Sequence, residues 1–120
     1  MKFTKTHEWV KIDGDIGTIG VTNYAQNQLG DVVYVELPEL NRQINQGDEV
    51  AVLESTKAAA DVYSPLSGTI IEVNTSLKNQ AELINQAPEG NGWIFKIKLK
   101  NIQEVESMMD LKEYQNTTGS

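Results

Sequence analysis

The chain has 120 residues, a formal net charge of −7, no cysteine and one histidine, His7. This length predicts a single domain over residues 1–120, and the acidic balance argues against nucleic-acid binding, which needs clustered Lys and Arg. The missing cysteines exclude disulfides and thiolate chemistry, and one histidine leaves little material for a zinc site or a catalytic triad. Composition therefore predicts a small acidic domain with few catalytic residues of its own, and no metal site is expected.

The first part of the chain predicts a hairpin followed by a short helix. Residues 9–19 alternate apolar and polar side chains around a turn at Asp13-Gly14. Either Thr22 or Asn23 can cap the helix, and Gly30 suits the position just after its end. A strand is expected to follow the helix.

The rest of the chain is rich in short strands and ends in helical segments. Turn residues separate the apolar runs that predict these strands, and the expected ranges are 32–37, 50–54, 58–63, 69–73 and 94–99. Residues 85–93 predict a loop. Asn101 and Asp110 each precede a glutamate by three residues, which predicts two helix starts, the first with Ile102, Val105 and Met109 on one face.

A weak internal repeat surrounds Lys57. The pattern Gly30-x-Val32-Val33-x-Val35 is similar to Gly68-x-Ile70-Ile71-x-Val73. We therefore expect two quasi-equivalent small sheets joined by a hairpin whose tip displays Lys57. Chance similarity in a chain rich in Val and Gly is the alternative.

Lys57 is the residue best placed to carry chemistry. Small residues follow it, so its long side chain has open surface beside it. Exposed lysines are mostly protonated and poor nucleophiles, which favours an anchor for a group attached by another enzyme over a catalyst. From the residues alone, an ordinary surface lysine in a turn remains the alternative.

The stretch from Gly47 to Gly68 closely resembles the lipoyl-lysine hairpin of the glycine cleavage system H-protein family. Other segments of the family are matched in order along nearly the whole chain: Thr6–Trp9, Gly20–Gln26, Leu29–Pro38 and Gly92–Ile97. Thr56 and Ala58 flank the lysine. Biotin carriers usually have Met on both sides, and lipoyl domains of 2-oxoacid dehydrogenases usually have Asp before it.

The resemblance implies a mostly β fold. The expected form is a flattened β sandwich of the lipoyl/biotinyl type (a barrel-sandwich hybrid), with a short helix in the N-terminal half and helices at the C-terminus. Residues 115–120 are expected to be a frayed tail. The resemblance assigns lipoyl attachment to Lys57, and its motif includes Gly47, Glu54, Ser55, Thr56, Ala58, Asp61, Pro65 and Gly68.

The same resemblance implies carriage rather than catalysis. Lipoic acid would form an amide with Lys57, supplying sulfur chemistry that a chain without cysteine lacks. The arm would take aminomethyl from a pyridoxal-phosphate glycine decarboxylase (P protein) to a tetrahydrofolate-dependent aminomethyltransferase (T protein). Dihydrolipoamide dehydrogenase (L protein), with FAD, would reoxidise it. A lipoate ligase or a lipoyl/octanoyl transferase would attach the lipoyl group, and the carrier is expected to be monomeric.

Two alternative functions are compatible with the same fold. One is a relay protein that donates lipoyl groups to 2-oxoacid dehydrogenases, and the other is an interaction domain without lipoylation. The acidic excess suits either general solubility or steering toward basic partner clefts.

A sheltering role for the surface is a further hypothesis. A labile loaded arm would benefit from protection from water, with its ammonium attracted to a carboxylate. The candidates are Glu8, Asp13, Glu36 and Asp61. His7 is expected to pack or hydrogen-bond beside Trp9 rather than to catalyse.

The sequence contains no recognised targeting signal. Residues 1–8 lack the apolar run of a signal peptide, and no stretch approaches the ~20 apolar residues of a membrane span. We expect a cytoplasmic protein without membrane binding, or a mitochondrial-matrix protein if a transit peptide has been removed.

Overall fold

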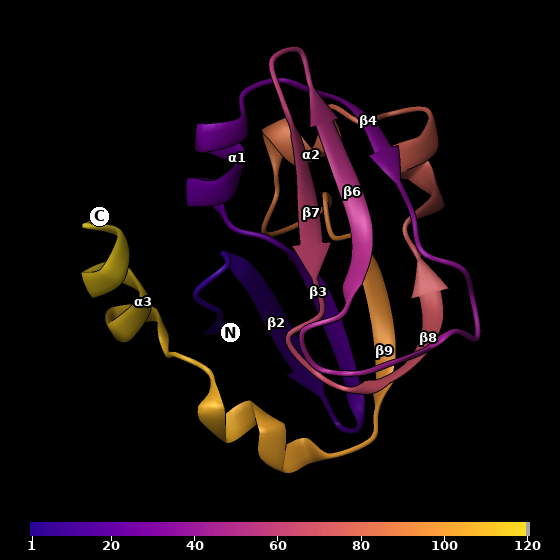
Figure 1. The fold of residues 1–120 in the computed structure, drawn as a ribbon, viewed down its shortest axis with the longest axis vertical. Coiled ribbons are helices and arrows are strands. Elements are labelled where there is room, and N and C mark those ends of the chain that lie inside the picture. The colour runs from indigo at the N-terminus through magenta and orange to yellow at the C-terminus, as the bar shows by residue number, and fades with distance from the viewer. Residues whose placement is uncertain (120) are drawn as a thin grey trace.

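The computed structural model describes residues 1–119 and contains two antiparallel sheets (Figure 1). The larger sheet has strand order β1-β2-β3-β9-β8-β5, and the smaller has order β4-β6-β7. The strands are β1 (Lys2–Phe3), β2 (Glu8–Asp13), β3 (Ile16–Val21), β4 (Val32–Glu36), β5 (Gln43–Ile44), β6 (Glu49–Ser55), β7 (Ala59–Tyr63), β8 (Gly68–Val73) and β9 (Phe95–Leu99).

Short helices lie between and after these strands. They are α1 (Asn23–Leu29), η1 (Thr75–Lys78), α2 (Leu83–Gln86), η2 (Ile102–Ser107) and α3 (Leu111–Thr118), where η marks a 3₁₀ helix. Thr22 is the cap of α1, its side chain accepting the Ala25 N–H. Gly30 follows with a φ of 85°, a conformation that favours glycine, so the predicted start and end of this helix are confirmed.

The core lies between the two sheets and confirms the mostly β sandwich expected from the sequence. Alternate residues of both sheets face inward and are fully or almost fully removed from water: Ile19, Val35, Leu53, Val62, Ile70 and Ile97. Burial of these apolar side chains is the main favourable contribution to folding. It also holds the β6–β7 hairpin, one of whose faces packs inward while its tip extends beyond the core (Figure 1).

The expectation of two quasi-equivalent sheets is wrong in strand number. The β2–β3 hairpin joins the larger sheet because β3 pairs with β9, with Gly17 opposite Ile97. The two halves of the internal repeat lie in different sheets, since Gly30 precedes β4 whereas Gly68 begins β8. The smaller sheet consequently consists of little more than the lysine hairpin and one neighbouring strand.

Two local expectations also differ from the structure. The first segment after Asn101 is a 3₁₀ helix that leaves Ile102 exposed, because Glu104 turns toward Ser67 and hydrogen-bonds it. The expected loop over 85–93 includes the end of α2 before it turns at Gly90. The hydrogen bonds to Glu104 come from a distant residue, whereas those of α2 and of the turn at Gly90 join residues three or four positions apart.

Helix α3 closes the described chain. Asp110 and Glu113 form the reciprocal capping box predicted for its start. The buried Tyr114 stacks on Phe3 with ring centroids 4.8 Å apart. The helix includes positions 115–118 of the segment expected to fray, and residue 120 lies outside the described residues. Over residues 1–119, no helix is both long and apolar enough to cross a membrane.

Candidate functional site

The tip of the β6–β7 hairpin is a tight four-residue turn from Ser55 to Ala58. The Ser55 N–H donates to the Ala58 carbonyl at 2.8 Å. The Ser55 hydroxyl oxygen accepts the N–H groups of Lys57 at 3.2 Å and Ala58 at 3.0 Å. A serine at this position satisfies backbone donors that the turn leaves unpaired, so its place in the motif has a structural cause.

The tip also contacts the loop between α1 and β4. The Thr56 N–H donates to the Asp31 carbonyl at 3.3 Å. The stem of Lys57 lies over Gly30, since a Cβ built at Gly30 would lie 3.4 Å from the Lys57 Cε. This contact between distant segments was absent from the sequence analysis, and no local pattern could have indicated it.

The amine of Lys57 is free to react with an acylating enzyme. The residue is exposed, and Nζ makes no ion pair or hydrogen bond within residues 1–119. An amide at this nitrogen would replace a hydrated charge with a neutral arm, without breaking any contact described here. The chemistry of the site therefore fits covalent attachment of a carboxylic acid such as lipoic acid.

The motif residues fall into two groups in space. Glu54, Thr56 and Ala58 are exposed beside Lys57, and Asp61 is exposed further along β7. Gly47, Pro65 and Gly68 lie at the opposite end of the hairpin. There the Gly47 N–H donates to Ser64, and a Cβ on Gly68 would come within 2.2 Å of the Lys98 carbonyl oxygen. The second group builds the hairpin's base, so it is remote from the lysine.

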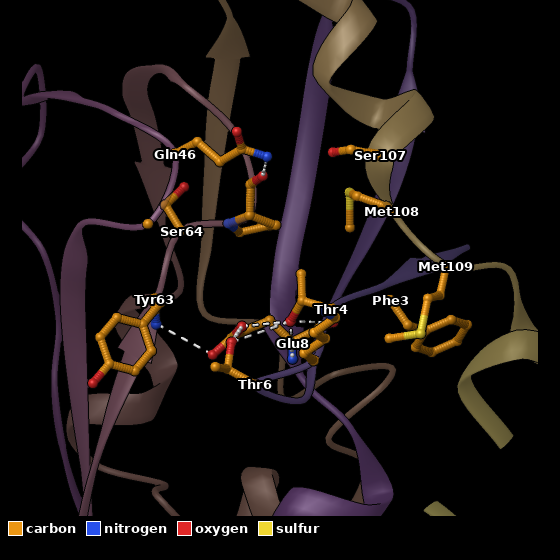
Figure 2. A pocket seen from close by; sticks show the side chains of 13 residues that line it. Phe3, Thr4, Thr6, Glu8, Gln46, Tyr63, Ser64, Ser107, Met108 and Met109 are labelled. Atoms are coloured by element: carbon orange, nitrogen blue, oxygen red, sulfur yellow. Dashed lines mark hydrogen bonds between the residues drawn. The ribbon is translucent and has the colours of Figure 1, made fainter. Parts of the chain in front are cut away.

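A pocket of about 390 Å³ opens at the base of the hairpin (Figure 2). Four separate parts of the chain line it: residues 3–6 with Glu8, residues 46–47, residues 63–65 and residues 107–109. Phe3, Met108 and Met109 provide apolar walls, and Glu8 provides the carboxylate. We call this the Glu8 pocket. Most of its lining was missed by the sequence analysis, because only the tertiary fold brings these segments together.

Glu8 is held in place by a set of donors. One carboxylate oxygen accepts the hydroxyl of Thr4 at 2.6 Å and also that of Thr6, and the other accepts the Tyr63 N–H at 3.2 Å. Glu8 is only 1% exposed. Burial raises the pKa of its carboxyl, and the hydrogen bonds from Thr4, Thr6 and Tyr63 partly oppose that shift. The pocket thus combines the fixed Glu8 carboxylate with apolar side chains, and the exposed Lys5 also lines it.

The other three candidate carboxylates are placed differently. Asp13 is exposed at the end of β2. Glu36 and Asp61 are exposed on the outer face of the smaller sheet, where each is paired across a strand with Val52. Glu8 alone of the four is buried and lines the pocket, so the four candidates are not equivalent.

His7 is hydrogen-bonded, though to a residue far away in sequence. Its Nδ1 lies 2.7 Å from the hydroxyl of Tyr114, and its ring lies against Tyr24 with centroids 4.6 Å apart. Burial lowers the pKa of His7, which favours the neutral ring. The indole of Trp9 instead donates to the Pro88 carbonyl.

The hairpin tip indicates a class of protein. A β sandwich that presents one exposed lysine on a tight turn is suited to carry a covalently attached group between enzymes.

Comparison with known proteins narrows this class to one family. The family model described as Glycine cleavage H-protein matches residues 1–120. A glycine cleavage system H protein of Thermotoga maritima is 56% identical over 114 residues, covering 95% of this chain and 92% of the relative. One from Acinetobacter baumannii is 48% identical over 115 residues, covering 96% and 93%. The chain belongs to the glycine cleavage H-protein family.

A solved structure agrees with this assignment. The crystal structure of a glycine cleavage system H protein from Mycobacterium marinum superposes with a TM-score of 0.91 at 33% identity. The match covers 99% of this chain and 96% of that one. The protein is a carrier component of the glycine cleavage system rather than an enzyme, in a family that carries lipoate.

Proposed function

We propose that Lys57 bears lipoic acid as an amide and that the resulting arm carries the aminomethyl group of glycine from the decarboxylase to the aminomethyltransferase. Dihydrolipoamide dehydrogenase then restores the disulfide of the arm, and a lipoate ligase or a lipoyl/octanoyl transferase attaches the lipoyl group. The observation that supports this most strongly is the free amine of Lys57 on an ordered hairpin tip. Hydrogen bonds hold the tip in two places, one within the turn and one to the Asp31 carbonyl. A fixed base with a long flexible arm gives each partner site a high effective concentration of the bound group.

The glycine exchange reaction tests this function. The lipoylated chain, mixed with glycine, the decarboxylase and labelled bicarbonate, is expected to support incorporation of label into glycine. The unlipoylated chain is the matched control and is expected to give only background. Incorporation at background with the lipoylated chain, together with transfer of its lipoyl group to a 2-oxoacid dehydrogenase, would favour the relay alternative.

The arm, once loaded, is proposed to rest in the Glu8 pocket. Strand β7 leads from the tip to Tyr63, whose N–H donates to Glu8, and its five residues span about 16 Å. The fixed carboxylate suits the ammonium of an aminomethyl group. The walls formed by Phe3, Met108 and Met109 suit the hydrocarbon of the arm and exclude water.

The outer face of the smaller sheet is proposed to guide the partner enzymes to the arm. Two cross-strand rows form this acidic face, whose residues are Tyr34, Glu54 and Ala59, then Glu36, Val52 and Asp61. Its three carboxylates have no Lys or Arg among these six residues, and the face ends at Lys57. Acidic surfaces of this kind accelerate encounters with basic clefts.

A charge-matched pair of variants tests this guidance. Glu36→Gln with Asp61→Asn is expected to slow association with the aminomethyltransferase roughly three- to tenfold at low salt and to flatten the salt dependence. Asp15→Asn with Glu106→Gln changes the net charge equally at exposed positions outside the acidic face. Stopped-flow association rates across a salt series measure both, and equal slowing in the two pairs would mean that net charge alone matters.

A further inference from the structure

One wall of the Glu8 pocket comes from the end of the chain. Residues 101–119, which we call the C-terminal strap, run along the β1 edge of the larger sheet, where Met109 forms a bridge with Phe3 (Figure 1). The strap contributes Ser107, Met108 and Met109 to the pocket, where Figure 2 shows Met109 beside Phe3 and Met108 beside Ser107. The position of the strap therefore decides whether the pocket is walled or open.

Glu104, which precedes the pocket-lining residues in the sequence, holds the first part of the strap. Its two carboxylate oxygens accept the N–H and the hydroxyl of Ser67, both at 2.8 Å. The Ser67 hydroxyl oxygen in turn accepts the Gln46 N–H at 2.9 Å, and the Gln46 side chain donates to the Pro65 carbonyl. Gln46 and Pro65 also line the pocket, so this end of the strap and the opposite wall share one hydrogen-bonded anchor.

From Met109 onward, the strap is held by one isolated backbone bridge and by the side chain of Tyr114. Phe3 and Met109 exchange backbone hydrogen bonds of 2.8 and 2.9 Å. The hydroxyl of Tyr114 lies 2.7 Å from both His7 Nδ1 and Thr22 Oγ1. Burial raises the pKa of Tyr114, so the hydroxyl keeps its proton and can donate to one of these atoms while accepting from the other.

Tyr114 and Met109 also pack against Phe3, Trp9 and Trp93, but the rest of the strap has few buried contacts. Ile102 and Leu111 are each 53% exposed, and Tyr114 is the only buried residue of α3 within the described chain. Segments with few buried apolar contacts open locally at a lower free-energy cost than the core. His7 precedes Glu8 directly, so the Tyr114 hydroxyl connects the strap to the segment that carries the pocket carboxylate, and it also contacts Thr22, the cap of α1.

We propose that Tyr114 is a positioning residue whose hydroxyl keeps the C-terminal strap closed over the Glu8 pocket and thereby prolongs the life of the loaded arm. This inference rests on the arm docking proposed above. It assigns the end of the chain a role in shelter, while the attachment of the arm at Lys57 does not depend on it.

Hydrogen exchange in the unlipoylated chain tests closure of the strap. Tyr114→Phe keeps the ring that stacks on Phe3 and removes the hydroxyl. We expect the Phe3 and Met109 amides to exchange roughly three- to tenfold faster, while the Ile97 amide of the core is unchanged. Thr117→Val, which removes a hydroxyl bonded only within α3, is the matched control and is expected to leave both amides as they are. Unchanged exchange in Tyr114→Phe would overturn the proposal.

The lifetime of the loaded arm tests the second part of the proposal, that closure of the strap protects the arm. In the lipoylated chain, Tyr114→Phe is expected to shorten that lifetime by a similar factor, whereas lipoyl attachment and the initial rate of glycine exchange stay at the wild-type level. Faster amide exchange with an unaltered lifetime would overturn the sheltering role while leaving the proposed carrier function intact. Loss of lipoyl attachment or glycine exchange in the wild-type chain would instead overturn the carrier function, and the amide measurements would still decide whether Tyr114 closes the strap.

Discussion

Lys57→Arg is expected to abolish lipoyl attachment completely. Arginine preserves the positive charge and the long stem, but its delocalised guanidinium does not accept the acyl group that a lysine amine accepts. Intact-mass spectrometry after incubation with lipoate, ATP and a lipoate ligase measures the result. The wild-type chain should gain one lipoyl group and the variant none, and with it all glycine-dependent exchange should disappear.

The matched control for this variant is Lys11→Arg. Lys11 is an exposed lysine on β2, away from the hairpin tip, and this variant should still gain one lipoyl group. A lipoyl adduct that persists on Lys57→Arg would assign attachment to another lysine. A wild-type chain that gains no adduct under conditions in which another H protein does would contradict carriage by Lys57 altogether.

Glu8→Gln is expected to shorten the lifetime of the loaded arm by about 10- to 100-fold. A hydrogen bond to a charged partner contributes about 1.5–3 kcal/mol, and the amide lacks the charge that attracts the ammonium. Release of formaldehyde and ammonia from the loaded chain, measured without the aminomethyltransferase, follows this lifetime. Asp13→Asn, which neutralises an exposed carboxylate outside the pocket, should leave it unchanged.

The lifetime of the loaded arm should also depend on pH in a way that identifies Glu8. The ionised carboxylate is the form that attracts an ammonium, and burial raises the pKa of Glu8. Protection of the loaded arm should therefore fall on acidification at a higher pH than an ordinary glutamate would require, and Glu8→Gln should lack this step. A wild-type lifetime in Glu8→Gln at every pH would mean that the arm is sheltered elsewhere.

The raised pKa of Glu8 also affects the folding stability of the unloaded chain. This stability should fall as pH rises, whereas protection of the loaded arm should increase. A carboxyl whose pKa is higher in the folded state binds its proton more tightly when folded. Its ionisation consequently lowers the free energy of unfolding as pH rises from the unfolded pKa through the folded one. Glu8 thus costs some stability at neutral pH, which is consistent with a group kept for binding rather than for folding.

Local hydrogen bonding explains which elements could be predicted. The Asp13-Gly14 turn, the Thr22 cap and the Asp110–Glu113 box each depend on residues only a few positions apart, and all three are present in the structure. The 3₁₀ form of η2 could not be predicted in this way. Its hydrogen bond from Ser67 to Glu104 joins residues 37 positions apart.

The sequence by itself determined the class of fold, the family resemblance and the choice of Lys57, because alternating apolar residues, turn residues and the hairpin motif are contiguous along the chain. Only the tertiary structure decided how Gly30 and Asp31 seat the hairpin tip, which carboxylate lines a pocket, and how the C-terminal strap forms one of its walls. These features depend on packing that brings distant segments within contact distance, and no local pattern encodes that proximity. The composition indicated a domain with few catalytic residues, and the fold adds an exposed lysine on a hydrogen-bonded hairpin tip and a pocket that contains the buried Glu8.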